Sequence, residues 1–250
     1  YSTNPLTNVS VNYELVGTPN NASGTISGDV VVNYYYKLKG ASLTVHHYIE
    51  GTTNELSDST IKPVHWGDNY TTSPSDKIDN NYELVGTPDN ASGTIASNSV
   101  VVTYYYRLKS AKLTVHHYIE GTTDELAATE SYDKKWTDEY TTSPSSNIDK
   151  NYELVSTPNN ASGTISGDVV VNYYYRLKSA TITVNYYIQD TTTKLGESII
   201  KDVHWGDEYS TNPLTNVSVN YELVGTPNNA SGIISGDVVV NYYYRLKGAS

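Results

Sequence analysis

The sequence predicts an all-β protein made of small tandem domains that form an elongated rod. The first observation is internal repetition: the string Asn-Tyr-Glu-Leu-Val returns at nearly constant spacing, from Asn12, Asn81, Asn151 and Asn220. The second is the alternation of apolar and polar side chains within each repeat, which is typical of strands. The third is composition, because 25 Tyr residues and a charged fraction of only 17% favour β-structure over helix.

The repeats set the expected domain boundaries. We expect the C-terminal half of a repeat at 1–39, followed by complete repeats at 41–109, 111–178 and 180–247. Residues 1–42 match 209–250 except that Ile233 replaces Thr25 and Arg245 replaces Lys37. The junctions contain no Pro-rich or Ser-rich linker, and short connectors restrict relative motion, which favours a rod. Because the chain begins with Tyr1 rather than Met, we expect it to be a segment of a longer array, with signal and anchor outside it.

The first and last strands of each repeat are the clearest elements. In the first strand, Leu43, Val45, His47 and Ile49 alternate with polar residues, so we expect them to face the core. Tyr186 stands in place of His47 in the third repeat, so we interpret His47 as a half-buried ring rather than a ligand. In the last strand the expected core face carries Val100, Val102, Tyr104, Tyr106 and Leu108, and the opposite face carries Val101, Thr103, Tyr105 and Arg107.

The sequence signals for the elements between these strands are weaker. A turn at 50–54 precedes a strand near 59–64, which Pro63 limits to an edge or an end. A second turn at 66–68 leads to Ser73-Pro74, which has the N-cap and first-turn residues of one short helical turn, repeated at Ser143-Pro144 and Asn212-Pro213. We expect a strand at 82–85, a long turn at 87–93 and a β-bridge at 94–95.

Composition and motifs exclude several classes of function. The net charge of −11 argues against nucleic-acid binding, and no apolar run approaches the ~20 residues of a membrane span. The absence of Cys removes thiolate metal sites and cysteine nucleophiles. No Ser–His–Asp order, phosphate-binding loop or zinc spacing is present. We therefore expect a non-enzymatic protein with no catalytic residue, no cofactor and no metal site.

Two sets of residues recur with the repeats and are candidate contact sites. The first is a Trp-X-Asp-X-Tyr turn that forms either a sugar-stacking patch or a packing surface. It comprises Trp66, Asp68, Tyr70, Trp136, Asp138, Tyr140, Trp205, Asp207 and Tyr209. The second is a row of outward-facing tyrosines suited to lateral contact or multivalent binding. It comprises Tyr35, Tyr105, Tyr174 and Tyr243.

Two covalent modifications are weaker alternatives. Lys109 with Asn81 or Asn90 and Glu83 provides the residue types of a Lys–Asn isopeptide bond. Four of the seven Asn-X-Ser/Thr sequons fall in the Asn-Ala-Ser-Gly turns, where Asn, Ser and Gly have ordinary turn roles, so we interpret these as structural.

The order of motifs along each repeat resembles the MucBP (mucin-binding protein) repeat. In the first complete repeat the matching segments are Leu43–Thr52, Trp66–Thr72, Asn81–Val85, Asn90–Thr94 and Val100–Tyr106. The resemblance covers every repeat. It implies β-rich, β-grasp-like modules in Gram-positive surface proteins, often adhesins anchored to the cell wall, with mucin or other host glycans as partners.

We therefore expect an extracellular repeat array that acts as an adhesin stalk and projects a binding region from the cell wall. One alternative is that the repeats themselves bind mucin glycans multivalently. Another is that chains self-associate into an extracellular filament. No nucleic acid and no membrane insertion are expected for this segment.

Overall fold

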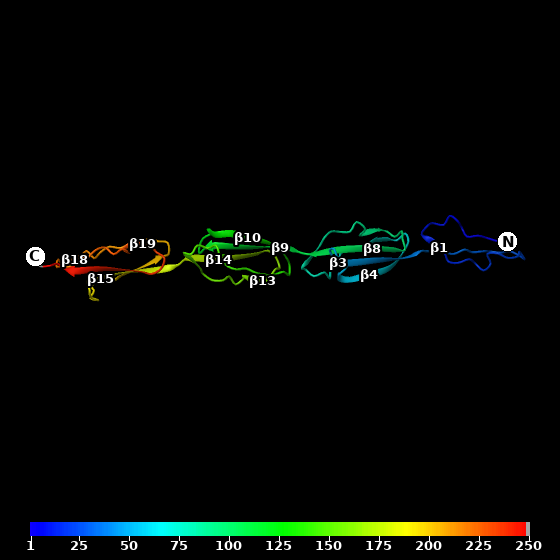
Figure 1. Ribbon diagram of the computed structural model, residues 1–250. Helices are drawn as coiled ribbons and strands as arrows, with labels where there is room; N and C mark the ends of the chain where they lie inside the picture. Colours follow the sequence, from blue (N-terminus) through cyan, green and yellow to red (C-terminus); the bar gives the residue numbers. More distant parts are fainter. Residues whose placement is uncertain (249–250) are drawn as a thin grey trace. The chain divides into compact units, whose positions relative to one another are not determined.

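The structure is a computed structural model that describes residues 1–248 (Figure 1). These residues divide into two compact units, residues 1–110 with 135–137, and residues 111–134 with 138 onward. The described residues form strands, turns and loops and contain no helix, so the all-β prediction is confirmed. The described residues therefore contain no helix that could cross a membrane.

Three repeats contain the same six strands in the same order. The first has β3 (Gly40–Ile49), β4 (Glu55–His65), β5 (Asn69–Thr71), β6 (Tyr82–Leu84), β7 (Ser92–Thr94) and β8 (Ser99–Leu108). The second has β9 (Ser110–Ile119), β10 (Glu125–Lys135), β11 (Glu139–Thr141), β12 (Tyr152–Leu154), β13 (Ser162–Thr164) and β14 (Val169–Leu177). The third has β15 (Ser179–Ile188), β16 (Ile199–His204), β17 (Glu208–Ser210), β18 (Tyr221–Leu223), β19 (Ser231–Ile233) and β20 (Val238–Leu246).

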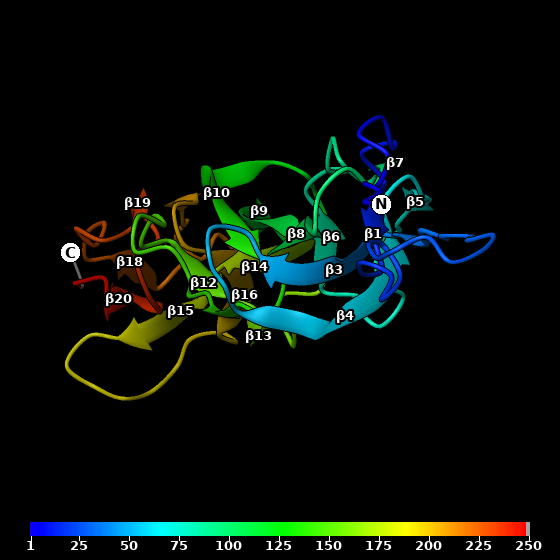
Figure 2. The same ribbon diagram turned by 90° about the vertical axis from the view of Figure 1, so that its right-hand side faces the viewer.

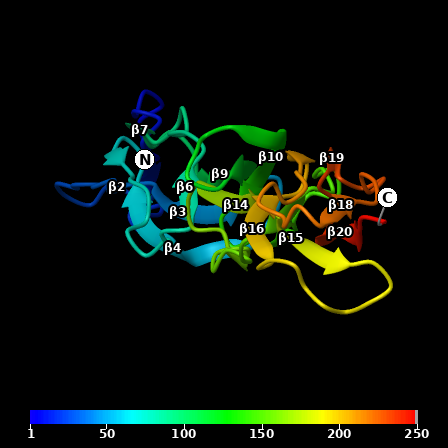
Figure 3. The same ribbon diagram turned by 90° about the vertical axis from the view of Figure 1, so that its left-hand side faces the viewer.

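Each repeat folds into a four-stranded mixed sheet and a two-stranded ribbon. In the first repeat the sheet order is β4-β3-β8-β6, and β5 pairs with β7. The central strands β3 and β8 are parallel, with Leu43 opposite Val100, whereas both outer pairs are antiparallel. Figure 2 shows β3 between β4 and β8, and Figure 3 shows β15 between β16 and β20 in the third repeat. Pro63 therefore lies on an edge strand, as its missing N–H requires.

The core of each repeat lies on one face of the central parallel pair. In the first repeat the buried cluster contains Leu43, Val45, Val102, Tyr104 and Tyr106, which are inward-facing residues of the predicted alternation. Half-buried side chains from the ribbon and the loops cover this cluster, Tyr70 and Ile78 among them. His47 is more buried than expected, because its ring stacks on Tyr104 with centroids 5.5 Å apart.

The short helical turn expected at Ser73-Pro74, Ser143-Pro144 and Asn212-Pro213 is wrong. This segment crosses the sheet as an irregular loop, and its backbone bonds to tyrosine hydroxyl groups of the last strand instead of to itself. The Ser75 N–H donates to the Tyr106 hydroxyl at 3.2 Å, and the Leu214 N–H donates to the Tyr244 hydroxyl at 2.6 Å. These bonds explain why the core rings are Tyr rather than Phe: each ring fills the core and its hydroxyl fixes a loop.

The segment at 1–39 forms only part of this fold. It contains β1 (Tyr13–Leu15) and β2 (Tyr36–Leu38), which pair as an antiparallel two-stranded sheet. These strands correspond to β6 and the end of β8. In the described chain no strand equivalent to β3 pairs with residues 30–36.

Candidate functional site

The turn that carries the first Trp lies against the end of the preceding repeat. The Trp66 N–H donates to the Lys39 carbonyl oxygen at 3.0 Å, and the Lys39 ammonium lies 4.5 Å from the centroid of the Trp66 ring. A cation over an indole face is attracted by the ring quadrupole. Both contacts recur with the same residue types, between Lys109 and Trp136 and between Lys178 and Trp205. The three Trp residues thus occupy equivalent junction positions.

The residue after each Trp has a left-handed backbone conformation. Gly67 has a φ of 90°, and a Cβ atom there would lie 2.7 Å from Nδ2 of Asn12 in the preceding repeat. Gly206 has a φ of 91°, and its Cβ atom would lie 3.1 Å from Nδ2 of Asn151. The same position is Thr137 in the second repeat, where a φ of 74° strains a β-branched residue. The close approach of the Asn explains the Gly after Trp in two of the three turns.

The Asp of each Trp-X-Asp turn binds its own turn. The Asp68 carboxylate accepts a hydrogen bond from the His65 N–H at 2.7 Å, and Asp207 accepts one from the His204 N–H at 2.9 Å. Asp138 holds the same place in the second turn. A carboxylate engaged in this way caps the turn and is not presented as a free acid or base.

The Tyr of the same motif packs within its own repeat. The Tyr70 hydroxyl donates to the Asn90 carbonyl oxygen at 3.2 Å, and the ring lies under Gly93 of β7. A Cβ atom on Gly93 would approach the Tyr70 hydroxyl to 3.1 Å. Equivalent bonds link Tyr140 to Asn160 and Tyr209 to Asn229. The Trp, Asp and Tyr side chains of the predicted patch therefore take three different sets of partners.

Three tyrosines of the predicted outward row, Tyr105, Tyr174 and Tyr243, lie on the face of each sheet opposite the core, and Tyr35 directly precedes β2. Tyr105, Tyr174 and Tyr243 are 41%, 39% and 40% exposed, and Tyr35 is 68% exposed. A second tyrosine, which the predicted row does not include, lies beside each of the first three rings on the neighbouring parallel strand. The ring centroids are 6.5 Å apart for Tyr48 and Tyr105, 6.1 Å for Tyr118 and Tyr174, and 6.0 Å for Tyr187 and Tyr243. The signal for this pairing was the Tyr at the end of each first strand.

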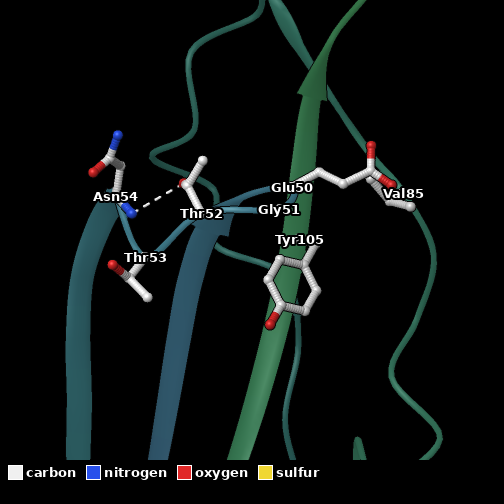
Figure 4. A pocket seen from close by; sticks show the side chains of 7 residues that line it. All are labelled: Glu50, Gly51, Thr52, Thr53, Asn54, Val85 and Tyr105. Atoms are coloured by element: carbon white, nitrogen blue, oxygen red, sulfur yellow. Dashed lines mark hydrogen bonds between the residues drawn. The ribbon is translucent and has the colours of Figure 1, made fainter.

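A hollow adjoins the outward tyrosine in the first and third repeats. In the first repeat it has a volume of about 710 Å³ and is lined by residues 50–54, Val85 and Tyr105 (Figure 4). In the third it has a volume of about 790 Å³ and is lined by residues 189–193, Val224 and Tyr243. The equivalent residues of the second repeat are 120–124, Val155 and Tyr174. The sequence predicts residues 50–54 only as a turn, and no pattern in it links this turn to Tyr105.

The histidines lie in different environments, on opposite faces of the sheet. His46 contacts Tyr48 on the outer face, whereas His47 and His117 lie in the core, where burial lowers the pKa of each imidazole below its ordinary value of 6.5. Nε2 of His117 lies 3.8 Å from Glu130. Over residues 1–248 no group of three His, Asp or Glu side chains could hold a metal ion.

The residues considered for covalent modification have other partners. The Lys109 ammonium donates to Asn80 and lies over Trp136, and Glu83 accepts a hydrogen bond from Arg107 at 2.8 Å. The Asn90 side chain donates to the Val101 carbonyl oxygen at 2.8 Å, and Asn21, Asn160 and Asn229 make the same bond in their repeats. In the three complete repeats the Asn amide therefore ties the Asn-Ala-Ser-Gly turn to the last strand, and Asn21 ties its turn to the segment before β2.

Comparison with known proteins gives the family. The MucBP domain matches four segments, at residues 1–37, 42–107, 112–176 and 181–245. Internalin J of Listeria monocytogenes serotype 4b is 33% identical over 231 residues, and that of serovar 1/2a is 31% identical over 237 residues. Both alignments cover 89% of this chain but only 24% and 26% of those proteins. The chain thus spans about a quarter of the length of these relatives.

A solved structure shows the same kind of fold at low sequence identity. The Bacillus anthracis TIE protein superposes with a TM-score of 0.51 and 8% identity, over 87% of this chain and 54% of that one. The four MucBP matches follow the repeats seen in the sequence and together cover most of the chain. The chain therefore belongs to the MucBP domain family, as a tandem array of MucBP repeats.

Proposed function

We propose that this array is a non-enzymatic stalk that projects a binding region from the cell wall of a Gram-positive bacterium. The observation that carries the proposal is the junction. The Lys39 N–H donates to the Asn12 carbonyl oxygen at 2.8 Å, and the Lys39 carbonyl oxygen accepts from the Trp66 N–H. One residue thus continues the hydrogen-bond ladder from β1–β2 into β3–β4. A connection held on both sides resists bending better than a free linker.

The same pair of backbone hydrogen bonds recurs at the other junctions. The Lys109 N–H donates to Asn81 at 2.9 Å, and the Lys178 N–H donates to Asn151 at 2.8 Å. Each Lys also places its ammonium over the next Trp ring. Because a strand of ten residues spans about 33 Å, each repeat of a stiff array adds roughly that length to the stalk.

Small-angle scattering of the whole chain tests the stalk. We expect a maximum dimension that matches end-to-end repeats, and a smaller average dimension for a triple variant, Trp66→Ala, Trp136→Ala and Trp205→Ala. A second variant with Phe at the three positions keeps a ring under each Lys and should restore most of the extension. Circular dichroism controls for the fold. Equal scattering curves for the parent chain and the folded Ala variant would overturn this role of the junction.

A second candidate function, direct binding of glycans by the repeats, is supported by the recurring hollow beside Tyr105 and Tyr243. It is less well supported at the Trp turn, because the Trp ring is covered by Lys and the Asp binds its own turn. A glycan array probed with the parent chain and the triple Trp variant separates these sites. Retained binding by the variant excludes the Trp turn as the sugar site.

A further inference from the structure

We propose that the hollows beside Tyr105 and Tyr243 are binding sites for neutral sugars, an inference that rests on the second candidate function above. Both hollows are built from the same parts: the turn after the first strand, an outward Tyr of the last strand, and an exposed Val. The recurrence at equivalent positions of two repeats, with volumes of about 710 and 790 Å³, shows that the fold generates them repeatedly.

The tyrosine supplies a fixed apolar platform. Tyr105 lies directly opposite Tyr48 in the parallel ladder, and the two rings contact each other with an interplanar angle of 48°. Tyr243 and Tyr187 repeat this arrangement at 29°. The electron-rich face of an aromatic ring attracts the weakly positive C–H groups of a pyranose. Because the neighbouring ring restricts Tyr105, little conformational entropy is lost when a sugar stacks on it.

The turn supplies hydrogen-bonding groups at the rim of the platform. The Thr52 hydroxyl donates to the Ile49 carbonyl oxygen at 3.0 Å and accepts from the Asn54 N–H at 3.1 Å, which fixes the turn. Figure 4 shows this turn beside the Tyr105 ring, with Glu50 directed towards Val85. Among the described residues, the Thr53 hydroxyl and the Asn54 side-chain amide take no hydrogen-bond partner. The rim therefore offers a hydroxyl, an amide and a carboxylate to sugar hydroxyl groups.

The third repeat builds the same rim with small changes. The Thr191 hydroxyl donates to the Ile188 carbonyl oxygen at 2.9 Å and accepts from the Thr193 N–H at 3.1 Å. Thr192 and Thr193 stand in place of Thr53 and Asn54. Two such sites on one chain allow weak individual contacts to add through effective concentration.

Charge selects the class of sugar. Glu50 lines the first hollow and Asp190 the third, and the chain carries a net charge of −11. The cation on the same strand as Tyr105 is Arg107, which is paired with Glu83 at 2.8 Å, and Arg245 is paired with Glu222 at 2.7 Å. A sialylated or sulfated sugar would meet carboxylates here without a free guanidinium to oppose them. Uncharged sugars are therefore the ligand class that we assign to these hollows.

The test uses the whole chain on an array of neutral oligosaccharides and their sialylated and sulfated forms. We expect binding to neutral glycans and at least about tenfold weaker binding by a variant with Tyr105→Ala, Tyr174→Ala and Tyr243→Ala. A Tyr→Phe variant at the same positions should retain binding within about threefold, because stacking needs the ring and not the hydroxyl. The matched control is Val101→Thr, Val170→Thr and Val239→Thr, on the same strands and the same face, which should bind like the parent.

The possible failures are distinguishable. Absence of binding to every glycan overturns both direct glycan binding and this site. Binding that survives in the folded Tyr→Ala variant overturns the site but leaves glycan binding standing. Preference for sialylated or sulfated glycans overturns the assigned ligand class. None of these outcomes changes the scattering test of the stalk, which depends on the Trp junctions.

Discussion

Residues 1–40 and 209–248 differ at only two positions but form different amounts of structure. In the C-terminal copy, β20 is nine residues long, and Val240 and Tyr242 are fully buried. In the N-terminal copy the corresponding strand β2 has three residues, and Val32 and Tyr34 are only half-buried. The differing residues, Thr25 and Lys37, lie outside this Val-Tyr run. The difference therefore comes from β15, which pairs in parallel with β20 from Ile182 opposite Val238 onward.

The contacts that the two copies share are those made within each copy. The Tyr34 hydroxyl lies 3.0 Å from the Thr3 hydroxyl, as Tyr242 lies 3.1 Å from Thr211. The Leu6 N–H donates to the Tyr36 hydroxyl at 2.8 Å, as Leu214 does to Tyr244. Loops and tyrosine anchors are thus local properties of the sequence, whereas the long last strand requires a partner from elsewhere in the chain.

The largest expected effect comes from a charged side chain at a core position that is buried in one copy and half-buried in the other. Val240→Asp places an unpaired charge in the core between β15 and the loops, and we expect a loss of about 3–5 kcal/mol from the free energy of unfolding of the third repeat. Val32→Asp, at the matching half-buried position, should cost less than about 1 kcal/mol. Hydrogen exchange of β15 and β20 measures the effect of Val240→Asp, and exchange of β1, β2 and residues 30–36 measures the effect of Val32→Asp. Equal loss of protection from the two variants would contradict the role given to β15.

The next prediction gives residues 30–36 a parallel partner strand. A copy of residues 178–208 placed before Tyr1 joins naturally, because Tyr209 follows Glu208 in the third repeat. We expect amide protection over residues 30–36 to rise to the level of residues 238–244. The matched control carries Val184→Asp in the added segment, because Val184 faces the core in the parallel ladder. Unchanged exchange of residues 30–36 in the extended chain would show that β15 is not sufficient.

A smaller effect is expected from the tyrosine anchors. Tyr242→Phe removes a hydroxyl that contacts Thr211 Oγ1 and donates to the Thr211 carbonyl oxygen at 2.9 Å, and should cost about 1 kcal/mol. Tyr34→Phe removes the same bonds, but water can replace them at this more exposed ring, so the cost should be under about 0.5 kcal/mol. Thermal unfolding and exchange in the loops at 1–7 and 209–215 measure the difference. A cost at Tyr34 as large as at Tyr242 would contradict this dependence on burial.

The smallest expected effect is a pH dependence of stability that differs between the complete repeats. Burial lowers the pKa of His47 and His117, so the folded state holds both rings neutral where the unfolded chain would protonate them. Stability is therefore full above the ordinary value of 6.5 and falls as the pH drops through 6.5 towards the lowered folded values. The third repeat has Tyr186 at this position and should not show the loss.

Exchange measured repeat by repeat between pH 7.5 and 5.5 checks this prediction. His117→Tyr is the matched variant, because it copies the third repeat, and it should remove the pH dependence of the second repeat. An unchanged dependence in that variant would assign the effect to other groups.

The inward-facing residues were predictable, and the partners of several site residues were not. Alternation placed Val102, Tyr104 and Tyr106 in the core correctly, because side-chain direction in a strand follows from a period of two. The helical turn at Ser73-Pro74 failed because its capping signals were outweighed by bonds to the hydroxyl of Tyr106, which lies on a later strand. The Trp66 contact with Lys39 and the Tyr105 contact with Tyr48 likewise depend on residues distant in the sequence.

The sequence by itself determined the repeat, the all-β class, the two faces of each strand, and the family through the order of its motifs. These properties depend on spacing and on local preferences, which every copy carries. Only the tertiary structure decided that β3 and β8 pair in parallel, that a junction Lys contacts each Trp, and that the turn after the first strand lies beside an outward Tyr. The reason is that such contacts join segments far apart in the sequence, as Ser42 meets Ser99, and their meeting depends on the whole sheet. The contrast between residues 1–40 and 209–248 shows this directly, since nearly identical sequences complete their last strand only where β15 is beside it.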